Sequence, residues 1–288
     1  MEENLKKIFL KIEKIPTLPV TINNIISVLN NPKSSADDVN KAVSSDFSLS
    51  SKVLKLVNSS YYGLSKKVSS ITQAIVLLGF NTIQSLALSA AVMDLFSTSE
   101  NPNFKRSDFW DHSFAVALIA KLISRNLHIN MREQETFFLC GLFHDIGKIV
   151  LDQYCPEEFN SVLEIVSIDG ISMVEGERRS ISTTHAEIGA KILERWKFPE
   201  NLYHSVRYHH DPQLDEKYQQ VTAIIYLSDF LCKAKRIGNS GDYDISGFSE
   251  SVISKFSISP EMINNLIKTE IDRELTKAKS LFDMIKAV

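Results

Sequence analysis

A run of eight residues near the middle of the chain places an imidazole beside a carboxylate among apolar neighbours. The run covers residues 141–148 and reads GLFHDIGK, with His144 and Asp145 at its centre. The apolar residues on both sides predict one buried helix across the whole run. A carboxylate buried in a helix is costly unless a cation pairs with it. We therefore expect a cation to contact Asp145.

Five more residues of the same chemical types occupy apolar helical stretches or their ends. They are His112, His185, His209, His210 and Asp229. Asp229 is the only charged residue in the apolar segment 223–232. His128 and His204 fall outside this pattern, so we do not count them among the candidates.

Histidine nitrogens and carboxylate oxygens together form the ligand set that zinc, iron and manganese use in proteins. Taken singly, each histidine can instead be a core residue that is hydrogen-bonded to the backbone or to a neighbouring acid. Taken together, one cation accounts for both buried carboxylates, whereas separate explanations must each find a partner. The sequence thus favours a site for one or two divalent transition metals (Fe, Mn or Zn). One metal can take both His144 and Asp145, or two metals can share the carboxylate.

Lys148 lies about one helical turn beyond His144 and is the one candidate for a catalytic role. Its ammonium group can reach an anionic ligand held at the metal. The alternative is a surface lysine near the end of a helix. The sequence alone leaves both interpretations open.

Composition favours an all-α protein. Of the 288 residues, 10 are glycine, about half the usual share, and 44% are hydrophobic. The formal charge of -3 argues against nucleic acid as a partner. The three cysteines form no C-x-x-C pair, which is typical of a reducing cytoplasm. No apolar stretch approaches the length of a membrane span, so we expect no membrane contact and a cytoplasmic protein.

Apolar spacing and turn signals divide the chain into three parts. Residues 1–100 read as a string of short helices that form an N-terminal helical subdomain. The polar segment 97–106 contains a proline and marks a boundary. Residues 106–235 carry all the candidate ligands and form a helical, metal-binding core. Residues 236–288 begin with a loop and form a C-terminal helical extension of unassigned role.

The order of these residues resembles the HD superfamily of metal-dependent phosphohydrolases, and the surrounding motifs resemble its HDOD branch, the HD-related output domain. The matching segments are NSSYYG at 58–63, SSITQAIVLLG at 69–79, FWDHS at 109–113, GLFHDIGK at 141–148 and the stretch from His185 to Pro199. The resemblance covers about residues 10–235. It implies an HD-type helical core and assigns metal ligation to His112, His144, Asp145, His185, His209, His210 and Asp229.

The resemblance also implies a function. HDOD proteins are generally considered signalling or output modules, and many have lost metal ligands, whereas this chain keeps every candidate. The segment DPQL after His210 lacks the Gly-Tyr-Pro signature of the HD-GYP phosphodiesterases, which argues against hydrolysis of cyclic di-GMP. We expect a bacterial, cytoplasmic regulatory protein that binds metal and acts through a signalling protein or a small phosphate-containing ligand rather than by catalysis. The alternative is a metal-dependent phosphohydrolase, a phosphodiesterase or a nucleotidase, in which Lys148 contacts a phosphate.

Overall fold

Polar side chains cap the first turn of many helices that the apolar spacing predicts. At the start of α3 (Ala36–Ser44), the Ser35 hydroxyl accepts a hydrogen bond from the backbone of Asp38, and the Asp38 carboxylate accepts one in return. Thr184 and Glu187 form the same capping box at the start of α12 (His185–Arg195). These reciprocal bonds satisfy backbone donors that have no partner within the helix. Helix α12 therefore begins at His185.

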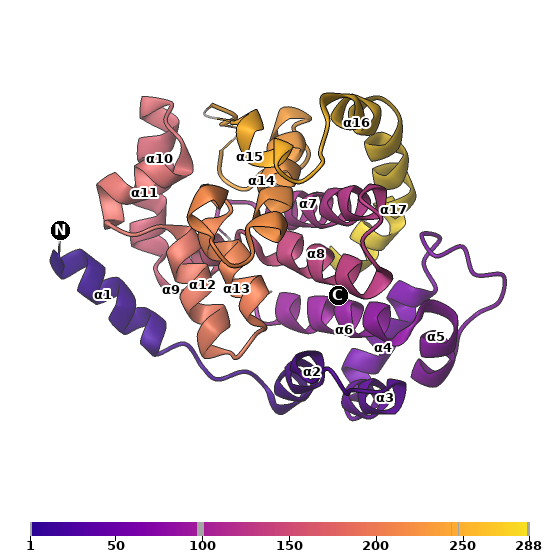
Figure 1. Cartoon of the computed structure of the whole chain (residues 1–288). Helices are drawn as coiled ribbons and strands as arrows, with labels where there is room; N and C mark the ends of the chain where they lie inside the picture. The colour runs from indigo at the N-terminus through magenta and orange to yellow at the C-terminus, as the bar shows by residue number, and fades with distance from the viewer. Residues whose placement is uncertain (1, 97–100, 243, 247, 287–288) are drawn as a thin grey trace.

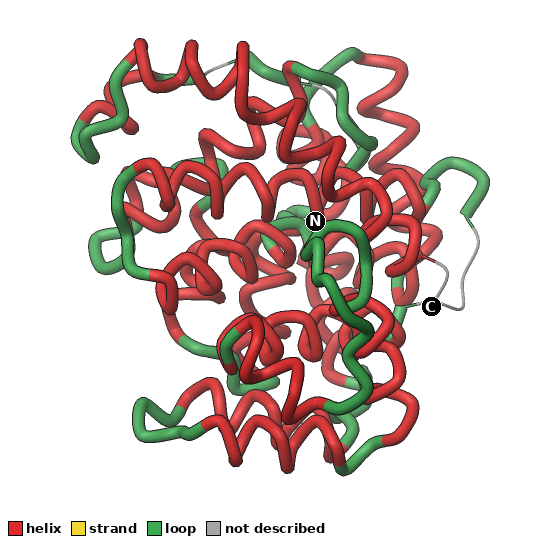
Figure 2. Tube along the Cα trace, turned by 90° about the vertical axis from the view of Figure 1, so that its right-hand side faces the viewer, coloured by secondary structure: helices red, strands yellow, loops and turns green. Residues whose placement is uncertain are grey.

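The computed structural model describes residues 2–96, 101–242, 244–246 and 248–286, and these residues contain no β-strand (Figure 2). The prediction of an all-α fold is confirmed. The first part of the chain contains α1 (Glu2–Glu13), α2 (Val20–Asn30), α3, α4 (Phe47–Val57), α5 (Ile71–Leu78) and α6 (Phe80–Asp94). The second part contains α7 (Arg106–Asn126), α8 (Met131–Phe143), α9 (Ile146–Tyr154), α10 (Pro156–Asp169), α11 (Met173–Ile181), α12, α13 (Glu200–Tyr208) and α14 (Gln219–Ala234). A single 3₁₀ turn, Pro212–Leu214, lies between α13 and α14, and the last helices are α15 (Glu250–Ser254), α16 (Pro260–Asn265) and α17 (Ile271–Lys286), with a π-helical turn at Leu266–Glu270.

Helix α7 is the central element of the second part and is buried along most of its length. Figure 1 shows α7, α8 and α6 stacked one below the other, with α14 crossing α7. Gly141 allows the close contact between α7 and α8, because a Cβ at this position would lie 2.7 Å from the Cα of Ala117. Helix α6 is buried from Ile83 to Met93 and joins the front helices α2 to α5 to this stack.

The two ends of the described chain both rest on the other helices. Helix α1 lies along the second part, where Lys11 pairs with Glu158 at 2.6 Å and the Arg195 guanidinium donates to the carbonyl of Ile12. Helix α17 packs on α7 and α4, and the hydroxyl of Tyr61 donates to Glu274. The first helix therefore packs on the second part of the chain, and the last helix packs on helices of both parts. No described helix combines the length and the apolar character that crossing a membrane requires.

The contact between α9 and α12 gives a direct test of this packing. A Cβ on Gly147 would lie 1.9 Å from the carbonyl oxygen of His185, so Gly147→Ala must push two helices apart. We expect this substitution to lower the free energy of unfolding by about 3 kcal/mol or more, as measured by urea denaturation. Gly170→Ala serves as the control, since a Cβ at Gly170 would meet open space. The only expected loss is about 1 kcal/mol, because alanine must adopt the left-handed backbone of Gly170. Equal losses for the two variants would contradict the tight contact.

Candidate metal centre

His144 and Asp145 lie at a junction between two helices rather than inside one. Helix α8 ends at Phe143, His144 and Asp145 form a turn, and α9 begins at Ile146. The expected single helix over 141–148 is therefore wrong. The backbone of Asp145 (φ -101°, ψ 12°) leaves the helical conformation, which turns α9 so that Gly147 meets the first turn of α12. The junction is fully buried, as predicted.

Three side chains from three segments form a first group around this junction. They are His112 on α7, His144, and Asp229 on α14, and their ligand atoms all lie within 4.8 Å of one another. The Nε2 atom of His112 lies 3.0 Å from Oδ1 of Asp229, and Nε2 of His144 lies 3.7 Å from the same oxygen. Asp145 adds its Oδ2 atom, 3.2 Å from Nε2 of His144 and 4.0 Å from Nε2 of His112. We call these four side chains position 1.

A second group gathers around the other oxygen of Asp145. It consists of Asp145, His185 on α12, and His209 and His210 after α13, again with ligand atoms within 4.8 Å of one another. The Oδ1 atom of Asp145 lies 3.0 Å from Nε2 of His185 and 3.5 Å from Nε2 of His209. The Nε2 atoms of His185 and His210 are 2.9 Å apart. We call this group position 2; the structure thus places all seven predicted ligands in two groups that share Asp145.

The outward nitrogens of the histidines fix which atoms face the centre. Nδ1 of His144 lies 2.7 Å from the carbonyl of Gly141, and Nδ1 of His209 lies 2.7 Å from the carbonyl of Val206. Nδ1 of His185 lies 2.8 Å from the Glu177 carboxylate. A carbonyl or an ionised carboxylate only accepts hydrogen bonds, so each Nδ1 carries a hydrogen and each Nε2 faces inward. This is the orientation in which a histidine binds a metal through Nε2.

The centre contains buried atoms that have no hydrogen-bond partner. They are Nε2 of His112, His144 and His209, and Oδ1 of Asp145 and Asp229. Buried polar atoms almost always have a partner, because an unpaired one costs free energy. The inward-facing histidine nitrogens and the two carboxylates therefore surround a point that has no positive charge. A divalent cation fits this donor set, and a proton on an imidazole is the alternative in its absence.

Two buried lysines pair with the two carboxylates. Nζ of Lys148 lies 2.8 Å from Oδ2 of Asp145 and donates to the Ser240 hydroxyl at 3.2 Å. Nζ of Lys233 lies 3.2 Å from Oδ2 of Asp229 and 3.0 Å from Asp242. Lys148 is completely buried, so its interpretation as a surface lysine is wrong. The expected cation beside Asp145 is present, yet both lysines leave the Oδ1 atoms without a donor.

Several residues that shape the centre escaped the sequence analysis. Glu177 is buried and holds His185, but it sits in the charged segment 175–179, which looks like an exposed helix face. Cys232 lies 3.4 Å from Nδ1 of His112, and no motif in the sequence marks it. Lys233 follows it directly. Its position one helical turn beyond the candidate ligand Asp229 is the signal that the sequence offers for Lys233.

Residues 237–242, which we call the strap, cover the centre from the C-terminal side. The backbone of Asn239 donates to the carbonyl of Asp108 at 2.9 Å, and Gly238 lies so close to α7 that a Cβ would be 2.3 Å from the nitrogen of His112. Ser240 contacts Lys148, and Asp242 contacts Lys233 and the backbone of Met173. Residues 237–242 of the C-terminal extension therefore cover the candidate metal centre.

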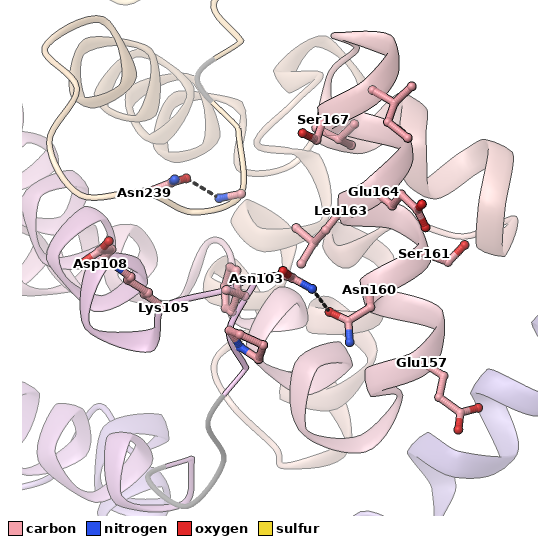
Figure 3. Close-up of a pocket in the computed structure, with 15 residues that line it drawn as sticks. Asn103, Lys105, Asp108, Glu157, Asn160, Ser161, Leu163, Glu164, Ser167 and Asn239 are labelled. Carbon is pink, nitrogen blue, oxygen red and sulfur yellow. Dashed lines mark hydrogen bonds between the residues drawn. The ribbon is translucent and has the colours of Figure 1, made fainter.

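A cavity of about 880 Å³ lies beside the strap and apart from the centre. Figure 3 shows its walls, with Asn103 bonded to Asn160 of α10 on one side and Asn239 of the strap on another. None of the seven predicted ligands lines this cavity. A smaller cavity of about 310 Å³ does reach the centre, because His210, Asp229 and Lys233 form part of its wall.

Burial and neighbouring charges set the protonation of the centre. Burial raises the pKa of Asp145, but His144, Lys148 and His185 outweigh it and hold that pKa well below its usual range. Burial opposes a charge on His144, but Asp145 and Asp229 outweigh this effect and raise its pKa to about 9. Burial dominates at His209 and lowers its pKa to about 4. Burial also opposes a charge on His185, but Glu177 and Asp145 outweigh it and raise its pKa. In the absence of metal, His144 therefore carries a proton at neutral pH.

Metal binding should displace this proton. Because the pKa of His144 is raised to about 9, the imidazole is protonated at pH 7.5 and must lose its proton to bind a metal. We expect the affinity to rise with pH up to about pH 9 and then to level off. Calorimetric titration at pH 7.5 in two buffers of different ionisation enthalpy should show release of at least one proton per molecule. Identical apparent enthalpies in both buffers would contradict this assignment.

Comparison with known proteins places this geometry in a family. The model of the HDOD domain matches residues 15–212. One similar solved structure is an HDOD domain protein of unknown function from Geobacter sulfurreducens. It is 26% identical to this chain, with a TM-score of 0.75 over 99% of this chain and 95% of that one. A candidate signal transduction protein from Marinobacter aquaeolei VT8 is 21% identical and shares the fold, with a TM-score of 0.79 over 98% of this chain and 65% of that one.

Curated relatives are longer than this chain. An uncharacterized protein of Treponema pallidum (strain Nichols) is 25% identical over 252 residues, which are 87% of this chain and 48% of the relative. The uncharacterized protein YuxH of Bacillus subtilis (strain 168) is 29% identical over 126 residues, or 44% of this chain and 30% of the relative. The chain thus spans less than half the length of either relative. With a family model that covers more than two thirds of its residues, the chain belongs to the HDOD family.

Proposed function

We propose that this chain is a bacterial, cytoplasmic regulatory HDOD protein that binds divalent metal at positions 1 and 2 and acts through contacts with a protein or a ligand. The observation that supports metal binding is the set of inward-facing, unpaired Nε2 and Oδ1 atoms around Asp145. Iron, manganese and zinc all accept this donor set. A reducing compartment is consistent with the cysteines, since Cys140, Cys155 and Cys232 are all free thiols.

The number of protein ligands favours a regulatory role over catalysis. Each position offers four side chains, because Asp145 contributes Oδ2 to position 1 and Oδ1 to position 2. Metal sites with four protein ligands are typically structural, whereas catalytic sites of tetrahedral metals keep one place for water. Lys148 is also engaged by Asp145 and Ser240, so it is not free to contact a substrate.

A metal-dependent phosphohydrolase is the alternative, and the 310 Å³ cavity is the observation that favours it. This cavity brings solvent to His210 and Asp229, one ligand from each position, beside the ammonium of Lys233. A metal that accepts more than four ligands would lower the pKa of a water molecule there and supply a nucleophile. In this case His210 and Asp229 would hold the metal, and Arg178 at the cavity wall would contact the substrate.

Loss of the shared carboxylate should empty both positions. Asp145→Asn keeps the shape of the side chain and removes its charge, so we expect bound metal to fall to less than a tenth of the wild-type content by elemental analysis. Asparagine is preferable to alanine because its side-chain oxygen can still accept from the buried ammonium of Lys148, which alanine would leave with Ser240 alone. The matched control is Asp152→Asn, a buried carboxylate that pairs with Arg106 at 2.7 Å outside the centre. It should lower stability and leave the metal content unchanged; equal metal loss in both variants would count against Asp145 as a ligand.

Turnover distinguishes the two functions. We expect metal-loaded protein to hydrolyse no cyclic dinucleotide and to act at most slowly on generic phosphate esters, because both positions are filled by protein ligands. Assays with cyclic di-GMP, nucleoside monophosphates and para-nitrophenyl phosphate measure this directly. Robust turnover of any of them that disappears in Asp145→Asn but persists in Asp152→Asn would establish the phosphohydrolase instead.

A further inference from the structure

Six buried charged groups surround the two metal positions, and their charges do not cancel. The carboxylates are Asp145, Asp229, Glu177 and Asp242, and the ammonium groups are Lys148 and Lys233. The side chains of all six are at most 10% exposed. Four negative charges face two positive ones, so the centre carries a formal excess of two negative charges.

The histidines do not change this balance when metal is bound. A histidine binds metal as a neutral imidazole, and the outward hydrogen bonds of His144, His185 and His209 already hold the Nδ1 hydrogens. One divalent cation therefore neutralises the centre completely. A second divalent cation would leave two uncompensated positive charges in the buried centre, which is strongly unfavourable.

The cavity of about 310 Å³ offers a place for a compensating anion. His210 of position 2 and Asp229 of position 1 both line it, so an oxyanion bound there would lie beside both positions. Arg178 also lines this cavity; it is exposed, and among the residues that the structure describes it has no acidic partner. A guanidinium is well suited to pair with phosphate oxygens.

Acidic groups in the same cavity discourage an anion that arrives without metal. Asp211 and Asp244, which are not buried and therefore do not count among the six groups above, line it together with Asp242 and Asp229. They outnumber the two cationic groups, Arg178 and Lys233, and Lys233 is already paired with Asp229 and Asp242. An oxyanion gains a favourable field there only when extra positive charge is present at the centre.

We propose that the centre binds one divalent cation by itself and binds a second only together with an oxyanion of the phosphate class held in this cavity. This inference rests on the proposed metal binding and adds a rule for its occupancy. Metal and phosphate binding are then thermodynamically linked, so that each raises the affinity for the other by the same factor. The number of bound ions would report whether the phosphate ligand is present.

Equilibrium dialysis with Mn²⁺ tests the rule, with bound metal counted by elemental analysis. In a chloride buffer without phosphate we expect one equivalent per chain, and with millimolar inorganic phosphate we expect two. Two equivalents without phosphate, or one equivalent in both buffers, would overturn the inference while leaving metal binding intact. No bound Mn²⁺ in either buffer would overturn the proposed metal binding itself.

Neighbouring arginines supply a matched pair of variants. Arg178→Met should raise the phosphate concentration needed for the second equivalent about tenfold, because one charge-assisted contact is lost, and leave the first equivalent unchanged. Arg179→Met is the control, since Arg179 is also exposed but pairs with Glu175 and Asp169 away from the cavity. If the two variants needed the same phosphate concentration, the placement of the anion in this cavity would be wrong. Both substitutions are on exposed side chains, so the fold is not at risk.

Discussion

The carboxylate of Asp145 is the constraint on which the centre depends. It is buried at the junction of α8 and α9, where water cannot solvate its charge. Lys148 contacts it from one turn further along the chain, while His144, His185 and His209 surround it. Helices that are distant in sequence must therefore deliver their side chains to one point. The close packing of α9 on α12 through Gly147 is part of this requirement.

The sequence predicted which side chains come together better than it predicted their surroundings. Histidines and carboxylates on apolar stretches are conspicuous because burial of such groups is costly, and all seven lie in the two groups that share Asp145. The capping box before His185 was also predictable, since the bonds that form it join residues only three positions apart. Local patterns of this kind are complete within one turn of helix and need no knowledge of the tertiary structure.

Features that depend on distant contacts were not predictable. The break between α8 and α9 is not visible in the apolar pattern, because apolar residues continue across it. The turn brings Gly147 against α12, a helix distant in sequence. The sequence is compatible with Lys148 at the surface, whereas in the structure Asp145 and Ser240 contact its buried ammonium. Glu177 reaches His185 from a separate helix, and the strap reaches the centre from a segment that has no recognisable motif. Each of these depends on a partner in a different helix or loop.

The strap also bears on how the protein folds. Ser240 contacts Lys148 across 92 residues of chain, and Cys232 contacts His112 across 120. Closing loops of this length has a high entropic cost, so such contacts form after the local helices. During synthesis on the ribosome, position 1 stays incomplete until Asp229 has left the exit tunnel, and it stays uncovered until the strap follows. Under the proposed metal binding, filling of position 1 is therefore a late event in the maturation of the chain, and metal at position 1 reports on completed tertiary structure rather than on helix formation.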